Sequence, residues 1–268
     1  MGKKNDVFIS AACALAAVTF LFPGCKPGKE MIVARGPEKV LLEQAAGFET
    51  TGNLIAARDA YQKLVADFPN NKEIADWQRR AEQLNVKLLF SPVVTPKSVT
   101  YVVQAGDSLE KIAREHTTTV EMIKRANSIT EDKIFPGMKL KVWNAPFSIF
   151  VDKSQNLLLL KSGEEIVKSY TVATGSNNST PVGKFKIVEK IVNPTWYKNN
   201  KAIPAGTPEN ILGTRWMGWD KEGYGIHGTT DPGSLGKQAT AGCVRMSNQD
   251  VEELYAIVPQ GTEVQIVD

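Results

Sequence analysis

The residues of this sequence best suited to chemistry are one histidine and one cysteine near its C-terminal end. His227 lies in the segment YGIHGT and precedes Cys243, in the segment AGCVRM, by 16 residues. A thiol with an ordinary pKa of about 8.5 is mostly protonated at neutral pH, and a neighbouring imidazole can remove that proton and return it to a leaving amine. The pair therefore indicates a candidate Cys/His acyl-transfer site.

Glycines lie close to both residues. They let a substrate approach the backbone, and N–H groups at a tight turn can bind an oxyanion. The alternative interpretation is that the two residues belong to unrelated glycine-rich strands. The spacing argues against zinc, since neither Cys-x-x-Cys nor His-Glu-x-x-His occurs. We expect neither a metal nor a cofactor.

The C-terminal half must position this pair, and its pattern predicts a mainly β domain. From residue 146 onward, short runs rich in β-branched and aromatic residues alternate with Gly and Pro. One helix is expected near the end, where Ser247 can cap it and Val251, Leu254 and Val258 recur at helical spacing.

The N-terminus has the features of an export signal over residues 1–25. Lys3 and Lys4 precede an uncharged stretch over residues 7–22, which is short for a membrane span. The alternative is a retained membrane anchor. The segment FPGC resembles a loose lipobox, which makes Cys25 a candidate lipidation site. Cys243 is then the lone thiol of the mature chain, either reactive or buried and inert.

The composition suits a folded, exported protein without a nucleic-acid partner. Hydrophobic residues make up 42% of the chain and charged residues 23%, so a buried core is expected. The net charge of +3 is too small to indicate nucleic acid, and it does not oppose an anionic partner such as a bacterial cell wall.

A helical pattern covers residues 38–88. Its three apolar stripes are separated by breaks at Gly52-Asn53 and at Pro69-Asn70-Asn71. The string GNLIAARDAYQKLVADFPNN resembles one tetratricopeptide unit. A single unit cannot bury both of its faces, so the segment is either a helical hairpin spacer or a module that binds a protein partner.

After a proline-containing linker, residues 99–143 predict a compact βααβ unit. The string YVVQAGDSLEKIAREHTTTVEMIKRANSIT and the later IFPGMKLKV resemble a LysM domain over its whole length. That resemblance implies binding to glycans that contain N-acetylglucosamine, such as peptidoglycan. His116 lies between the two expected helices, where we interpret it as a solvated loop residue.

The segment over residues 146–268 resembles the YkuD-type L,D-transpeptidase catalytic domain. The resemblance rests on STPVGKFKI, NILGTRWMGWDKEGYGIHGT and GSLGKQATAGCVRMSNQDVEELY. It implies that Cys243 attacks the third residue of a peptidoglycan tetrapeptide stem, expels D-alanine and forms a thioester, which an amine of a second stem resolves into a 3→3 cross-link.

The resemblance also assigns roles to individual residues. His227 is the base, and the carbonyl of Gly228 orients it. Backbone N–H groups of Ala241, Gly242 and Cys243 form the oxyanion hole. The substrate-binding residues implied by position are Arg245, Trp216 and Tyr224. Arg245 falls on the same side as Cys243 if the segment is extended, whereas the aromatic residues have the alternative of ordinary packing.

One departure from the family pattern lies beside the nucleophile. Members commonly carry Ser-His or Ser-Arg before Gly-Cys, and here the pair is Thr240-Ala241. Threonine keeps the hydroxyl, whereas alanine removes a polar side chain, which affects acceptor handling and rate.

The sequence thus predicts a multidomain α+β protein of the bacterial cell envelope: a signal over 1–25, helices over 38–88, a glycan-binding module over 99–143 and a catalytic domain over 146–268. Its partners are peptidoglycan, a membrane through a lipid anchor, and a protein for the helices. Alternatives are an L,D-carboxypeptidase, in which water resolves the thioester, and a non-catalytic wall-binding protein. A wall peptidase of the NlpC/P60 type is disfavoured, because there the cysteine precedes the histidine.

Overall fold

The computed structural model describes residues 36–268. The expected signal over residues 1–25, with the candidate lipidation site Cys25, lies outside this described part. Within it, no helix combines the length and apolar character that crossing a bilayer requires.

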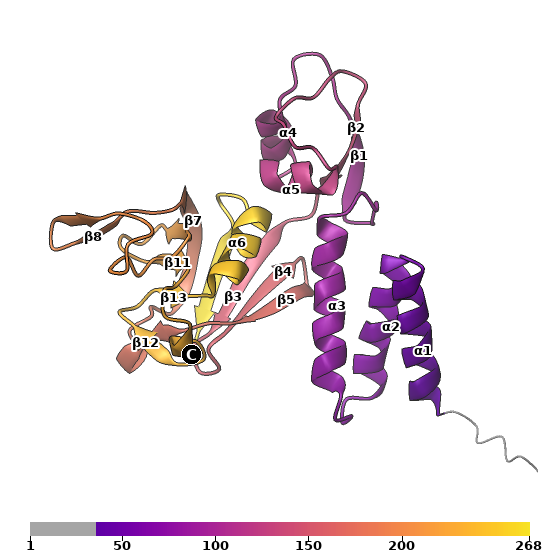
Figure 1. The fold of residues 1–268 in the computed structure, drawn as a ribbon, viewed down its shortest axis with the longest axis horizontal. Coiled ribbons are helices and arrows are strands. Elements are labelled where there is room, and N and C mark those ends of the chain that lie inside the picture. The colour runs from indigo at the N-terminus through magenta and orange to yellow at the C-terminus, as the bar shows by residue number, and fades with distance from the viewer. Residues whose placement is uncertain (1–35) are drawn as a thin grey trace, which may run out of the picture. The chain divides into compact units, whose positions relative to one another are not determined.

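The N-terminal segment consists of three helices (Figure 1): α1 (Pro37–Thr50), α2 (Leu54–Asp67) and α3 (Ile74–Leu89). Pro37 begins α1 at the position where a missing N–H costs nothing. The side chain of Asn53 caps α2 by accepting from the N–H of Ala56. Tyr61 and Trp77 are buried between the helices, which confirms the predicted helical segment and its core.

The predicted βααβ unit is also present. It comprises β1 (Ser98–Val102), α4 (Leu109–Glu115), α5 (Val120–Ala126) and β2 (Lys139–Trp143), and the two strands pair antiparallel. Ser108 and Thr119 cap the two helices through their hydroxyl oxygens, which explains where each helix begins.

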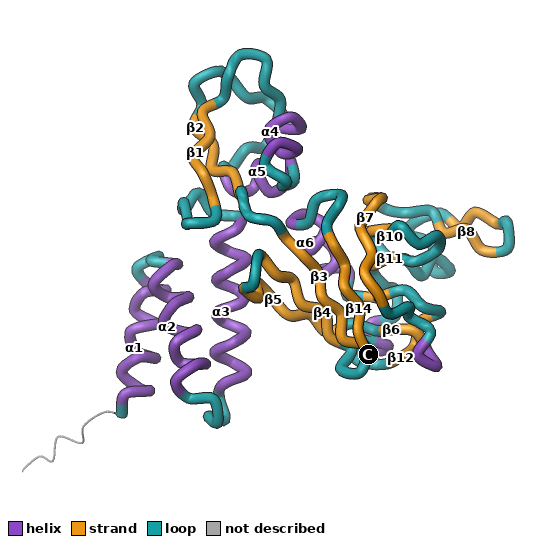
Figure 2. Tube along the Cα trace, turned by 180° about the vertical axis from the view of Figure 1, so that it is seen from behind, coloured by secondary structure: helices purple, strands orange, loops and turns teal. Residues whose placement is uncertain are grey.

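The C-terminal segment is built on an eight-stranded sheet in the order β13-β11-β10-β7-β14-β3-β4-β5 (Figure 2). The sheet is mainly antiparallel, and the pairs β14–β3 and β11–β13 are parallel. Its strands are β3 (Phe147–Asp152), β4 (Leu157–Ser162), β5 (Glu165–Thr171), β7 (Gly183–Val192), β10 (Arg215–Trp219), β11 (Gly225–His227), β13 (Val244–Arg245) and β14 (Glu263–Val267).

Short elements complete this domain. Helix α6 (Asn248–Ile257) is capped by Ser247 as predicted, and its residues Val251 and Leu254 are fully buried in the core of the sheet. The remaining pieces are β6 (Thr174–Gly175), η1 (Ser176–Asn178), β8 (Trp196–Lys198), β9 (Lys201–Ile203), η2 (Pro232–Ser234) and β12 (Gln238–Thr240).

The helical segment packs directly against the sheet. Helix α3 packs against the edge strand β5 (Figures 1 and 2). The hydroxyl of Ser169 donates one hydrogen bond that the two carboxylate oxygens of Glu82 share, at 2.9 and 3.0 Å. Asn85 donates to the backbone carbonyl of Val167 at 3.0 Å. An edge strand exposes unpaired backbone groups, and this contact gives the carbonyl of Val167 a donor.

The βααβ unit is joined to both neighbours. Met122 of α5 and Leu89 of α3 are buried in the same hydrophobic core as the large sheet. The ammonium of Lys141 on β2 donates to the backbone carbonyls of Leu88, Leu89 (3.4 Å) and Ser91 (2.7 Å), at the C-terminal end of α3. Burial lowers the pKa of Lys141 to about 8.

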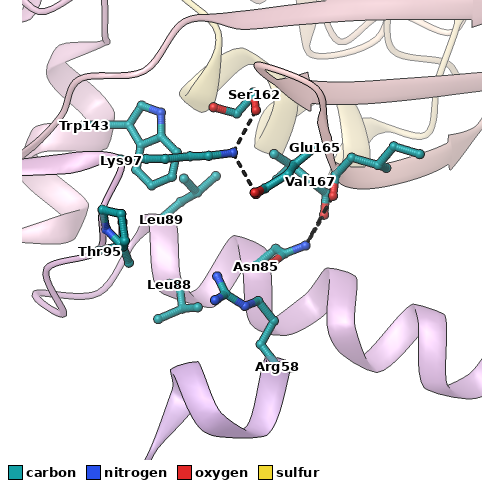
Figure 3. Close-up of a pocket in the computed structure, with 12 residues that line it drawn as sticks. Arg58, Asn85, Leu88, Leu89, Thr95, Lys97, Trp143, Ser162, Glu165 and Val167 are labelled. Carbon is teal, nitrogen blue, oxygen red and sulfur yellow. Dashed lines mark hydrogen bonds and ion pairs between the residues drawn. The ribbon is translucent and has the colours of Figure 1, made fainter. Parts of the chain in front are cut away.

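A small cavity of about 130 Å³ marks the joint between the three segments (Figure 3). Lys97 crosses it, donating to the carbonyl of Ser162 at 2.8 Å and pairing with Glu165 at 2.7 Å. Two buried polar atoms on its wall, Trp143 Nε1 and Ser162 Oγ, have no hydrogen-bond partner within the described part of the chain. The joint therefore combines apolar packing with polar contacts.

Replacing Lys141 tests this joint. In Lys141→Met the buried carbonyls at the end of α3 lose their donor, and we expect the free energy of unfolding to fall by about 2 kcal/mol. Denaturation in urea measures the change. Lys139→Met, on the same strand but exposed, is the matched control and is expected to change little. Equal stability of the two variants contradicts the proposed importance of the contact.

Candidate active site

A cavity of about 500 Å³ opens on the face of the sheet that carries Cys243 and His227. Strands β7, β8, β10 and β11, the loop before β10 and the turn before β13 supply its walls. Five residues singled out from the sequence line it: His227, Cys243, Arg245, Trp216 and Ala241. Residues far apart in the sequence are thus gathered around one thiol.

The parallel pairing of β11 with β13 brings the histidine and the cysteine together. Ile226 pairs with Val244, and His227 pairs with Arg245. Ile226 and Val244 are fully buried in the core, so the alternating residues on each strand project to the opposite face, toward the cavity. Cys243 precedes Val244 and lines the same cavity as Arg245.

The imidazole of His227 is held by its own neighbour in the chain. Its Nδ1 lies 2.7 Å from the carbonyl oxygen of Gly228. A carbonyl can only accept, so Nδ1 carries the proton and Nε2 keeps its lone pair. Burial lowers the pKa of His227 to about 4, and the positive charge of Arg245 acts in the same direction. The ring is therefore neutral at pH 7 and able to accept a proton.

The thiol of Cys243 is partly exposed in the cavity and donates to the carbonyl of Gly223 at a sulfur–oxygen distance of 3.6 Å. Burial raises its pKa above the ordinary value, while the charge of Arg245 opposes that effect. These two shifts favour a neutral thiol beside a neutral imidazole in the resting site.

Thr240 organises the turn that carries the nucleophile. Its hydroxyl donates to the carbonyl of Cys243 at 2.7 Å and accepts from the N–H of Gly242 at 3.1 Å. Gly242 has a φ of +137°, and a Cβ there would lie 2.7 Å from the ring of Tyr224, so only glycine fits. The hydroxyl group of Thr240 therefore makes two hydrogen bonds that fix the backbone of this turn.

Two residues assigned to the site from the sequence have contacts of their own in the resting structure. The N–H of Gly242 already has an acceptor in Thr240. Tyr224 is not among the residues that line the cavity; its ring stacks on Trp219 at 6.4 Å between centroids and packs beneath Gly242. Tyr224 thus supports the turn from below.

Asn248, which the sequence analysis did not single out, ties the histidine loop to α6. Its Oδ1 accepts from the N–H groups of Thr214 (3.2 Å) and Thr229 (3.1 Å), and its Nδ2 donates to the carbonyl of Thr229 (2.9 Å). A Cβ on Gly228 would lie 2.2 Å from Oδ1, so the peptide after His227 fits closely around this amide. The only feature of the sequence that could have indicated this role is the position of Asn248 directly after the helix cap Ser247.

Comparisons with known proteins identify two domain families in the chain. The family model described as the YkuD L,D-transpeptidase catalytic domain matches residues 146–266, and the LysM domain model matches residues 101–143. A Bacillus licheniformis protein named "Putative L,D-transpeptidase YkuD" is 37% identical over 175 residues, covering 62% of this chain and 97% of that protein.

Other relatives extend the comparison. A Bacillus subtilis protein named "Putative L,D-transpeptidase YqjB" is 40% identical over 126 residues, covering 45% of this chain and 70% of its own length. A solved L,D-transpeptidase from Mycobacterium smegmatis is 19% identical, with a TM-score of 0.41 over 49% of this chain and 64% of that one. Because the sequence similarity spans nearly the whole of the Bacillus licheniformis protein, the chain belongs to the YkuD family of L,D-transpeptidases.

The role of the Thr240 hydroxyl is testable with two substitutions. Thr240→Val keeps the shape but removes both hydrogen bonds, and we expect turnover of a disaccharide-tetrapeptide to fall by about tenfold or more because the turn loses its geometry. Thr240→Ser keeps the hydroxyl and is expected to stay within about twofold. If both variants are equally active, the two hydrogen bonds have no catalytic consequence.

The protonation state of the resting site predicts a pH dependence. Because the pKa of Cys243 is raised, alkylation by iodoacetamide is expected to be slow at pH 7 and to accelerate only at a higher pH than alkylation of an unperturbed thiol does. Peptide mapping by mass spectrometry isolates the Cys243 signal, and glutathione gives the unperturbed reference. A rate that has already reached its plateau near pH 7 contradicts the neutral pair and indicates a thiolate–imidazolium pair.

Proposed function

We propose that the protein is a peptidoglycan L,D-transpeptidase that works through a thioester on Cys243. The observation that carries the proposal is that His227, at the end of β11, and Cys243, in the turn just before the neighbouring strand β13, line one cavity, with Nδ1 of the imidazole hydrogen-bonded to the Gly228 carbonyl. This leaves a neutral Nε2 as the base for a neutral thiol.

In the first half-reaction, Nε2 of His227 takes the proton of Cys243 while the sulfur attacks the carbonyl of the third residue of a tetrapeptide stem. Backbone N–H groups of Ala241 and Cys243 receive the oxyanion, and that of Gly242 joins them once it releases Thr240. The imidazolium then gives its proton to the departing amine of D-alanine, and the thioester remains.

In the second half-reaction, an amine attacks the thioester carbonyl. His227 accepts the proton of that amine and returns it to the leaving sulfur, which restores the thiol. The acceptor is the side-chain amine of another stem, which gives a 3→3 cross-link, or an amine of an envelope protein that becomes tethered. With water as the acceptor, the same steps give an L,D-carboxypeptidase.

The presence of a LysM module favours a substrate in the cell wall. It binds glycan strands in this proposal and keeps the enzyme close to many stems, which raises their effective concentration. The protein acts in the bacterial envelope, with lipidation at Cys25 as its membrane attachment. The exposed faces of the N-terminal helices are the place for a protein partner.

A digest followed by mass spectrometry tests the reaction. The protein and its Cys243→Ala variant are incubated with disaccharide-tetrapeptide. We expect cross-linked dimers that are one D-alanine lighter than two monomers, and only with Cys243 present. Tripeptide without dimer identifies the carboxypeptidase. An absence of product with both proteins, on substrate that another L,D-transpeptidase cross-links, contradicts the proposal.

Acylation by a carbapenem gives a second test that needs no acceptor. The drug carries an activated acyl group, and we expect Cys243 to gain its mass once per chain, with no gain in Cys243→Ala. His227→Ala is expected to slow acylation by about a hundredfold or more, because the base is lost. Intact-protein mass spectrometry follows the rate, and a folded, reduced protein that is not acylated rules out the acyl-enzyme.

A further inference from the structure

Trp216 lies against the proposed base. It is the direct cross-strand partner of His227 in the antiparallel pairing of β10 with β11. The two rings are stacked, with centroids 6.0 Å apart and planes inclined by 25°. The indole therefore lies over the imidazole, which is 2% exposed.

Two glycines make room for the indole. Gly218 on β10 and Gly225 on β11 face one another across the same strand pair. A Cβ on Gly218 would lie 2.8 Å from Nε1 of Trp216, and a Cβ on Gly225 would lie 2.9 Å from two carbons of its six-membered ring. Both distances are too short for real atoms, so the orientation of the indole depends on both glycines.

A carboxylate fixes the outer edge of the ring. Oε2 of Glu189 on β7 accepts from Nε1 of Trp216 at 3.1 Å. Glu189 pairs with Gly218 in the register of β7 with β10, so the carboxylate reaches the indole across the gap that the glycine leaves. It is the single acidic residue among those lining the cavity.

We propose that Trp216, held by Glu189 and by the two glycines, is a positioning residue for His227. The indole keeps the imidazole in the plane in which Nδ1 stays on the Gly228 carbonyl and Nε2 remains available to the thiol. It also excludes water from that face of the ring. This inference rests on the proposed function, and it replaces the substrate-binding role expected for Trp216 from the sequence.

The groups around His227 determine in which direction its pKa changes when the indole of Trp216 is removed. Arg245 is its neighbour on β13, and Glu189 lies on the far side of the indole. On β10, Arg215 pairs with Glu252 of α6 and does not line the cavity. Burial is the largest cause of the lowered pKa of His227, so removing the indole admits water and raises that pKa toward its ordinary value near 6.5.

Nuclear magnetic resonance on protein labelled with carbon-13 at histidine gives the decisive reading. The chain has only two histidines, so His116 in the LysM module is an internal control. In Trp216→Ala we expect the titration midpoint of His227 to rise by at least about one pH unit, and the acid limb of the acylation rate to move with it. The midpoint of His116 is expected to stay unchanged.

Three further variants separate positioning from substrate contact. Glu189→Gln keeps an oxygen that accepts from the indole and is expected to behave like the parent protein. Glu189→Ala loses that acceptor and is expected to lower kcat several-fold with little change in KM. Trp216→Phe keeps a ring over the glycines, so its histidine shift is expected to be smaller than that of Trp216→Ala and in the same direction.

The titration distinguishes failure of this inference from failure of the proposed function, because it reads His227 in protein that has no substrate. An unchanged titration midpoint of His227 in both Trp216→Ala and Trp216→Phe overturns the inference. A raised KM with unchanged kcat in these variants overturns it too, and indicates that Trp216 contacts the substrate instead. If the His227 midpoint shifts in Trp216→Ala but the parent protein is never acylated, the positioning role of Trp216 is supported and only the proposed reaction is contradicted.

Discussion

The site depends on one short parallel pairing, that of β11 with β13. Two residue pairs, Ile226 with Val244 and His227 with Arg245, set its register. The apolar member of each strand is locked in the core, and a shift by one residue would turn His227 inward and the thiol segment away from the cavity. The large buried sheet, the helix α6 and the amide of Asn248 all contribute to holding that register.

Much of the fold was predictable, because it follows from local chemistry. Hydroxyl caps begin the short helices, and Ser247 begins α6 as the pattern indicated. His227 and Cys243 were found from residue type, and the structure brings them to one cavity. Three features were not predictable. The docking of α3 on β5, the stack of Trp216 on His227 and the bonds of Asn248 join residues distant in the sequence, where periodicity carries no information.

Glycines around the cavity serve different purposes, which composition alone cannot separate. Gly242 is required by its own backbone angle and by the ring beneath it, whereas Gly218 and Gly225 are required by a side chain that lies over them. The first kind permits a turn and the second permits a flat contact on a sheet. A sequence motif shows each of these positions only as glycine. The contacts of Trp216 in the structure are what distinguish Gly218 and Gly225 from Gly242.

The burial of Met122 in the core of the large sheet has a consequence for how the enzyme meets its polymer. A module on a flexible tether lets the catalytic domain sample every peptide within a radius. Here the LysM-like unit is packed into the core of the catalytic domain. Under the proposed function, a glycan strand bound to that unit would present to Cys243 the stems at a set offset, so the pitch of the glycan rather than the length of a linker would select the peptide.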